Sequence, residues 1–362
     1  MSKIPIHKKI QEADRCRLGS DFHKALILYN EIIETSQDDL GINLKANLYS
    51  GHCCRIIGDF QGSVGFYKNA IDISEALDDE HSLADAYVGL SLSLKGMSRW
   101  SEADDLIGKA IKIYKDLKDH IGLAYGYWAR GAIYRVAGEI KKSISLYSRA
   151  LSIFEDNAFK SGIGYALCGL GGSTRIAGDF EKSLSFYTRA NKIFIRIKDK
   201  FGRAYSHCGI GNAYRMLFRL KEADDHFKKA TKLYEEINDV VSFSYTLWSM
   251  AVMHKLNAAY NDAKTLLKKA DDNFIKTSDA RGEAYCKITL GEIKYLEGSQ
   301  PEAIELLEDA YKICETYSLK LEMLHCLMIR DIIMAQDVER HIQAYKDIGV
   351  KIRYSRLPLN LP

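Results

Sequence analysis

The chain has 362 residues and a formal net charge of +3, and 47% of its residues are hydrophobic and 27% charged. A near-neutral charge at this size argues against indiscriminate binding of nucleic acid, although a local basic groove remains compatible with it. No stretch reaches the roughly 18 apolar residues of a membrane span, and the N-terminus lacks the apolar core of a signal peptide, so we expect no membrane partner. The eight cysteines show no CxxC spacing, which predicts reduced thiols in a cytoplasmic protein.

Residues 6–35 are predicted to form a divergent first helix pair, because Ser20-Asp21-Phe22 matches Gly58-Asp59-Phe60 further along the chain. From about residue 41 to residue 317 the sequence then repeats with a period of 40. An alanine marks each copy, and a large side chain precedes it. The alanines are Ala70, Ala110, Ala150, Ala190, Ala230, Ala270 and Ala310.

Turn residues divide each copy into two apolar stretches of about 17 residues, long enough for one helix each. Gly58, Gly138, Gly178 and Gly298 mark the turn within a copy, and Asp79, Asp119, Asp199, Asp239 and Asp279 mark the turn between copies. Residues 319–347 are predicted to be a helical C-terminal cap, and residues 351–362 an extended tail.

These positions resemble the tetratricopeptide repeat, which has a glycine, a tyrosine, a small residue, an aromatic residue and an alanine at set spacings. In the copy from Ala124 to Asn157 these places are filled by Gly131, Tyr134, Ser143, Tyr147 and Ala150. The 40-residue form is similar to the repeats of LGN-type adaptors and kinesin light chains. The resemblance implies an all-α, right-handed superhelical solenoid of about eight helix-turn-helix units within residues 1–350, with a C-terminal capping helix.

One arc of each first helix carries the small and apolar residues that packing requires, and the opposite arc is predicted to be free. The resemblance implies that this free arc lines a concave groove. With Ala124 as the first position of its repeat, the second position is a tyrosine in five consecutive copies and the twelfth is basic in six. The candidate ligand-binding residues are Tyr125, Tyr165, Tyr205, Tyr245, Tyr285, Arg55, Lys95, Arg135, Arg175, Arg215, Lys255, Trp128, Asn212 and Trp248.

Both rows also have a structural interpretation. The tyrosines could pack on the adjoining first helix. The basic row could be solvated or could pair with acidic residues at the next helix start, such as Asp59, Glu139 and Asp179. Cys168 and Cys208 occupy equivalent positions of adjacent helices, about 8 to 10 Å apart, which is too far for a closed zinc site without further ligands.

No P-loop, HExxH or GxSxG motif occurs, so we predict neither catalytic residues nor a cofactor or metal. The sequence favours a non-catalytic scaffold that binds an extended anionic or aromatic-bearing peptide of a protein partner. Two alternatives remain open. One is binding of single-stranded nucleic acid through tyrosine stacking and arginine–phosphate contacts, and the other is an accessory subunit of an enzyme that binds a small anionic ligand.

The tail from Lys351 to Pro362 is apolar. We expect it to pack on the last helices or to enter the groove of a neighbouring copy, which would drive self-association.

Overall fold

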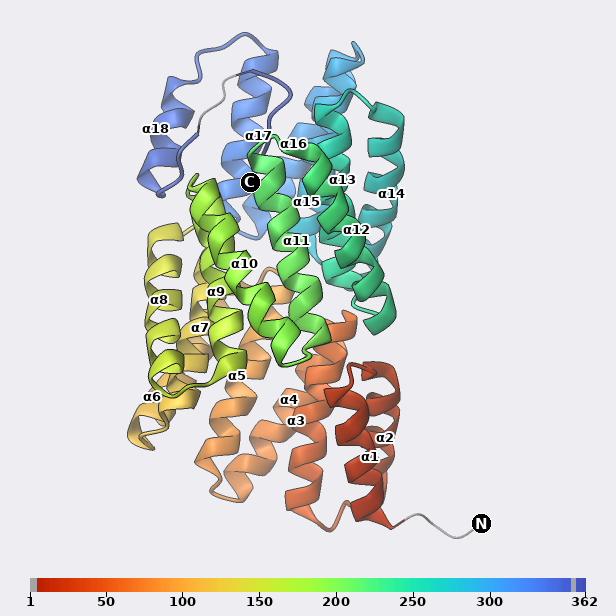
Figure 1. Cartoon of the computed structure of the whole chain (residues 1–362), viewed down its shortest axis with the longest axis vertical. Coiled ribbons are helices and arrows are strands. Elements are labelled where there is room, and N and C mark those ends of the chain that lie inside the picture. The colour runs from red at the N-terminus through yellow and green to blue at the C-terminus, as the bar shows by residue number, and fades with distance from the viewer. Residues whose placement is uncertain (1–4, 353–355) are drawn as a thin grey trace.

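The computed structural model describes residues 5–352 and 356–362, which form an all-α solenoid (Figure 1). The helices of this described part are α1 (Ile6–Leu18), α2 (Phe22–Thr35), α3 (Leu40–Ile57), α4 (Phe60–Ala76), α5 (Glu80–Gly96), α6 (Trp100–Asp116), α7 (His120–Val136), α8 (Ile140–Asp156), α9 (Lys160–Ile176), α10 (Phe180–Arg196), α11 (Lys200–Met216), α12 (Leu220–Ile237), α13 (Val240–Leu256), α14 (Tyr260–Thr277), α15 (Ala280–Leu296), α16 (Gln300–Thr316), α17 (Lys320–Ile333) and α18 (Glu339–Asp347). A helix begins every 20 residues from Leu40 to Lys320, which confirms the predicted 40-residue helix pair.

Aspartate side chains start most of the first helices of the repeats. The carboxylates of Asp79, Asp119, Asp199, Asp239 and Asp279 each accept a hydrogen bond from the backbone N–H three residues later. Such an N-cap satisfies a donor that the first turn of a helix would otherwise leave free. The aspartates that sequence analysis placed in turns therefore fix where these five repeats begin.

Each turn from α3 to α17 also contains a residue with a positive φ angle. Gly58, Gly138, Gly178 and Gly298 adopt this conformation, as their glycine identity suggests, but so do Lys118 and Ser278, with φ values of 57° and 54°. A left-handed conformation strains a residue that has a Cβ atom. The repeating packing therefore imposes the turn geometry even where the sequence lacks glycine.

Consecutive repeats are joined by an aromatic ring that is wedged between two glycines. The ring of Tyr147 lies against Gly131 of its own repeat and Gly169 of the next, where an added Cβ atom would come within 3.2 and 2.2 Å of it. Tyr67 lies between Gly51 and Gly89 in the same way, and Tyr187 between Gly171 and Gly209. Close packing at three equivalent junctions fixes the distance between neighbouring first helices.

The small residues that face these junctions add buried hydrogen bonds. The hydroxyls of Ser63, Ser143 and Ser183 donate to the carbonyl oxygens of Gly51, Gly131 and Gly171, at 2.7 to 2.8 Å. Each bond ties the second helix of a repeat to the first one. A buried serine hydroxyl without a hydrogen-bond partner would destabilise the fold, so these bonds favour the same alignment of the two helices in each repeat.

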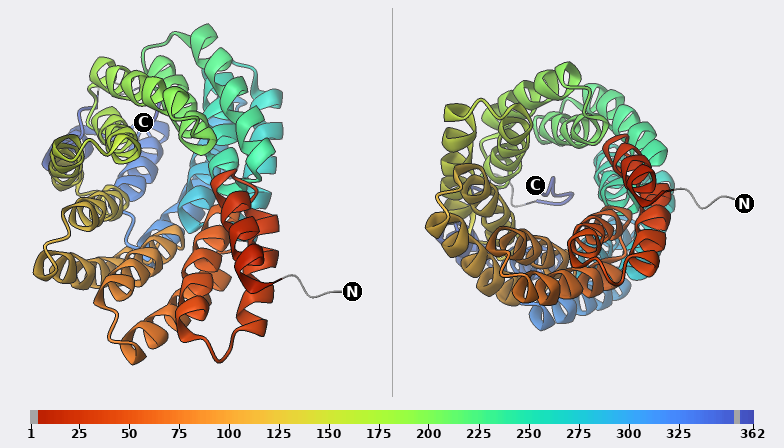
Figure 2. Two further views of the ribbon diagram at one scale, coloured as in Figure 1. Left: turned by 60° about the horizontal axis from the view of Figure 1, so that its bottom comes forward. Right: turned by 90° about the horizontal axis from the view of Figure 1, so that it is seen from below.

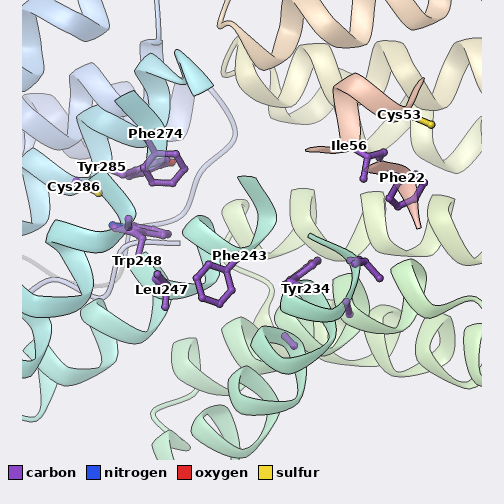
Figure 3. Packing of buried hydrophobic residues seen from close by; sticks show 14 of the residues in the cluster. Phe22, Cys53, Ile56, Tyr234, Phe243, Leu247, Trp248, Phe274, Tyr285 and Cys286 are labelled. Carbon is purple, nitrogen blue, oxygen red and sulfur yellow. The ribbon is translucent and has the colours of Figure 1, made fainter. Parts of the chain in front are cut away.

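The superhelix completes a turn and closes on itself. Viewed along its axis, the helices form a ring with the C-terminal segment inside (Figure 2). Lys320 on α17 pairs with Glu139 before α8 at 3.1 Å, and the Trp100 indole donates to the Tyr317 carbonyl at 3.2 Å. Phe22 and Ile56 share a buried cluster with Tyr234 and Phe243 of α12 and α13 (Figure 3). The N-terminal helices thus pack directly against the second half of the chain.

In the described part of the chain, no helix combines the length and the apolar character that crossing a membrane would need.

Because the Tyr147 ring fits closely between two glycines, a single methyl group added at one of these glycines should lower the stability of the fold. Gly169→Ala would force a Cβ atom into the ring of buried Tyr147. We expect a loss of stability of about 1–3 kcal/mol, measured by urea denaturation followed by circular dichroism.

Gly65→Ala is the matched control, because Gly65 is exposed in the middle of α4 and an added Cβ atom would meet nothing within 4 Å. This variant should gain about 0.5–1 kcal/mol, since alanine favours a helix over glycine. Equal stability of the two variants would contradict the close packing of the Tyr147 ring against Gly169.

Candidate functional site

The ring of helices surrounds a channel that contains two adjoining cavities. The larger has a volume of about 950 Å³ and the smaller of about 230 Å³. Lys95, Arg135 and Tyr205 line both. A cleft of this size, lined by aromatic and charged side chains, is typical of a ligand site.

Most of the residues predicted from the sequence meet in this channel. The larger cavity is lined by Arg55, Lys95, Arg135, Tyr125, Trp128, Tyr165 and Tyr205. The smaller is lined by Lys95, Arg135, Arg175, Tyr205, Asn212, Tyr245, Trp248 and Tyr285. The structure thus brings the predicted aromatic and basic rows together, while their role in binding a ligand stays a prediction.

Three arginines of the basic row line the cavities and contain buried donor atoms without partners. The Nε atoms of Arg55, Arg135 and Arg175 are buried and lack a hydrogen-bond partner, as does Nη1 of Arg175. Glu139, a predicted partner of this row, instead pairs with Lys142 and Lys320. A buried N–H without an acceptor costs about 1–3 kcal/mol, and more when it is charged. The row is therefore suited to an incoming acceptor.

Two members of the row do not face an open groove, which corrects the expectation that the whole row is free. Arg215 and Lys255 have exposed fractions of 0% and 1%. The C-terminal segment Leu357–Pro362 covers them, and the buried Lys255 ammonium pairs with Glu292 at 2.7 Å. Sequence analysis placed the tail on the last helices or in a neighbouring copy, and it did not connect the tail with Arg215 and Lys255, because these residues are far from it in sequence.

The tyrosine row has a partly structural role. The hydroxyls of Tyr165 and Tyr245 donate to Asp199 and Asp279 at 2.8 and 3.1 Å, and these two aspartates cap the first helix of the next repeat. Each bond therefore links adjacent repeats, as the packing interpretation proposed. Tyr125 differs, because it is 36% exposed and its ring stacks on Trp128 with the centroids 5.5 Å apart.

Tyr285 and Trp248 are buried together beneath the smaller cavity. Their ring centroids are 4.5 Å apart (Figure 3). Arg281 donates to the Tyr285 hydroxyl at 3.0 Å. Arg281, which lines the same cavity, was not among the predicted residues. It lies one helical turn before Tyr285, and this spacing could have indicated it.

Carboxylates line the larger cavity together with the basic row. They are Asp85, Asp119, Asp199 and Asp239. Burial raises the pKa of Asp239 to about 6. Burial and the nearby Arg135 lower the pKa of Lys95 to about 8. The site therefore contains both signs of charge, which sequence analysis missed because it considered the aspartates only as turn residues.

The described residues contain no cluster of three or more His, Cys, Asp or Glu side chains that could hold a metal ion.

The paired helices, their 20-residue spacing and the inner channel define a repeat solenoid, and residues 162–236 of this solenoid are tetratricopeptide repeats. The sequence profile described as "Tetratricopeptide repeat" matches residues 162–236. A comparison with curated protein sequences finds no match.

Solved structures share the fold over most of the chain. A Rap protein complexed with Competence and Sporulation Factor is 16% identical, with 91% of this chain and 98% of that chain covered and a TM-score of 0.56. The Rap conjugation gene regulator of plasmid pLS20, in complex with the Phr* peptide, is 12% identical, with coverages of 87% and 97% and a TM-score of 0.65. Aspartyl phosphate phosphatase F from Bacillus subtilis is 13% identical, with coverages of 86% and 94% and a TM-score of 0.56.

The tyrosine bonds predict which members of that row stabilise the fold. Tyr165→Phe should lose about 0.5–1.5 kcal/mol of stability, because it removes the bond to the Asp199 cap. Tyr125→Phe should change stability little, because the ring makes the contact with Trp128. Thermal unfolding of the two variants measures the difference, and equal melting temperatures would count against the link between repeats.

Proposed function

We propose that this protein is a non-catalytic scaffold whose channel binds an extended peptide that carries acidic and aromatic side chains. The observation that carries the proposal is the set of buried guanidinium donors without partners, on Arg55, Arg135 and Arg175, at the walls of the cavities. A carboxylate can accept two parallel bonds from one guanidinium, which would satisfy these donors.

The shape of the channel supports an extended polypeptide as the ligand. Residues 357–362 already lie inside it without forming a helix, so the channel has room for an extended backbone. Two solved proteins of this fold are described in complex with Competence and Sporulation Factor and with the Phr* peptide. The exposed ring of Tyr125 and the ring of Trp128 supply flat apolar area for an aromatic side chain of the ligand.

The alternatives have weaker support. Carboxylates of Asp119, Asp199 and Asp239 in the larger cavity would repel the closely spaced phosphates of a nucleic acid. One solved protein of this fold bears the name of a phosphatase, so the fold by itself does not decide between binding and catalysis. Our proposal of a scaffold rests on the helical repeats and caps, which account for residues 6–347, and on a channel suited to binding.

Charge reversal at the open part of the row tests the proposal. A labelled hexapeptide of alternating glutamate and phenylalanine should bind the full chain, and Arg135→Glu with Arg175→Glu should weaken binding at least about 10-fold, because attraction becomes repulsion. Fluorescence anisotropy measures the affinity, which should also fall as salt rises.

The matched probe replaces each glutamate with glutamine and should bind weakly to both proteins. Circular dichroism should show the double variant folded, since neither arginine is fully buried. Equal binding of both probes, or unchanged binding by the folded double variant, would overturn the proposed role of the row. Preferential binding of oligodeoxythymidylate would favour the nucleic-acid alternative.

Lys95 should make the binding of the glutamate-containing probe depend on pH. Its pKa lies near 8 rather than at the usual value near 10.5, so it is charged at pH 7 and loses its proton as the pH rises through 8. Affinity for the glutamate probe should therefore fall between pH 7 and pH 9. Lys95→Arg keeps the charge over this range and should remove most of the dependence. The same fall in affinity in wild type and variant would assign the titration to another group.

A further inference from the structure

The channel contains an occupied site in addition to the open cavities. Leu359, Asn360 and Leu361 are buried in it, and Leu359 and Leu361 pack in a cluster with Val136, Ala284 and other residues of the inner wall. Five hydrogen bonds to three side chains and one carbonyl hold this short segment, and these groups belong to helices α11, α13 and α15.

The pair of Lys255 and Glu292 binds the backbone of one extended residue. The Lys255 ammonium donates to the Leu359 carbonyl at 2.9 Å, and the Glu292 carboxylate accepts from the Leu359 N–H at 2.7 Å. An extended residue presents its N–H and C=O in this way to an adjacent strand. Because these contacts use only backbone atoms, the pair selects an extended chain and not a particular side chain.

Arg215 provides the sequence-dependent contact. Its Nη1 donates to Oδ1 of Asn360, and its own carbonyl oxygen accepts from Nδ2 of Asn360 at 2.8 Å. A side-chain amide is the group that offers an acceptor and a donor together. Arg215 also donates from Nη2 to the Leu361 carbonyl at 2.9 Å. The bonds therefore favour an asparagine side chain, and the burial of Leu359 and Leu361 in the apolar cluster favours an apolar residue on each side of it.

Within the described part of the chain Arg215 forms no ion pair with a carboxylate, and it takes two of its acceptors from this segment. Its remaining hydrogen-bond partner is Asn212, and burial together with Arg175 lowers the pKa of Arg215 to about 9. A buried cation held by neutral oxygens is stable only while those oxygens stay in place. Removal of the segment would expose this end of the channel and make the same donors available to another chain.

Arg215 also occupies the same repeat position as Arg135 and Arg175, which face open cavities with unsatisfied donors. Pro362, at the end of the buried segment, lines the smaller cavity, as does Arg175. The occupied and open sites are thus neighbours along one row of equivalent side chains.

We propose that Arg215, Lys255 and Glu292 form a peptide site specific for an apolar–Asn–apolar sequence, and that residues 357–362 are a tethered ligand that competes with such a peptide from another chain. This proposal rests on the proposed function only in that the channel binds an extended peptide. The segment lies in the channel of its own chain, where Leu359 and Leu361 pack with residues of α15, α16 and α17, so the first of the two expected places, the last helices, is the one observed. Residues 353–355, part of that predicted tail, lie outside the described residues.

A labelled peptide with the sequence of residues 357–362, Leu-Pro-Leu-Asn-Leu-Pro, tests the site in the full chain. A tether holds its ligand at an effective concentration on the order of millimolar, so the wild-type chain should bind the added peptide weakly. Asn360→Ala weakens the tethered ligand, and we expect the added peptide to bind this variant at least 10-fold more tightly. Fluorescence anisotropy gives both affinities.

Two controls isolate the site. Arg356→Ala changes an exposed residue just before the buried segment and should bind the peptide like wild type. Adding Arg215→Ala to the Asn360→Ala variant should abolish the gain, as should a peptide with alanine in place of its asparagine. An Asn360→Ala chain that is folded and binds no better than wild type would overturn the proposal.

Hydrogen exchange on the unmodified chain tests the competition between the free peptide and residues 357–362 even if the Asn360→Ala variant does not fold. The Leu359 amide donates to Glu292 and should be protected, and a large excess of the free peptide should speed its exchange. Unchanged protection at saturating peptide would overturn the competition. The glutamate–phenylalanine probe reports on the open cavities through Arg135 and Arg175, so its failure with a positive result here would reject the proposed acidic ligand alone.

Discussion

The insertion of an aromatic ring between the glycines of two consecutive first helices is the contact on which the rest of the structure depends. Tyr147 between Gly131 and Gly169 shows it most clearly, because a methyl group at either glycine would meet the ring. A contact this close allows one helix separation, and its recurrence in other repeats gives those repeats the same geometry. The curvature of the superhelix and the alignment of its inner residues follow from this repetition.

Closure of the superhelix then changes the environment of the inner face. Contacts such as Lys320 with Glu139 and Trp100 with Tyr317 join parts of the chain that are far apart in sequence. The groove becomes a channel with walls on all sides (Figure 2). Charged groups inside it lose water, which lowers the pKa of Lys95 and raises that of Asp239. On an open surface the basic residues would donate hydrogen bonds to water. Inside the channel they lose part of this hydration and require other acceptors.

Some members of the basic row have hydrogen-bond acceptors and others do not. Arg215 and Lys255 obtain acceptors from the C-terminal segment and from Glu292, whereas Arg135 and Arg175 keep unsatisfied atoms beside open space. Arg215 and Lys255 bind neutral backbone carbonyls and a side-chain amide, whereas Arg135 and Arg175 are suited to bind an anion. One repeated side-chain position therefore supports two kinds of recognition within the same channel.

The sequence by itself determined the helix pairs and their 40-residue period, because these depend on local capping, helical periodicity and repetition. The inner position of the tyrosine and basic rows was expected only from the resemblance to the tetratricopeptide repeat. The sequence indicated neither the glycine pairs around Tyr147 as one contact nor the bond from Tyr165 to Asp199, since both join residues of different repeats. The tertiary structure alone decided that the superhelix closes and that residues 357–362 lie within it over Arg215. Such contacts depend on curvature accumulated over many repeats, and no local pattern encodes where the two ends of that curve meet.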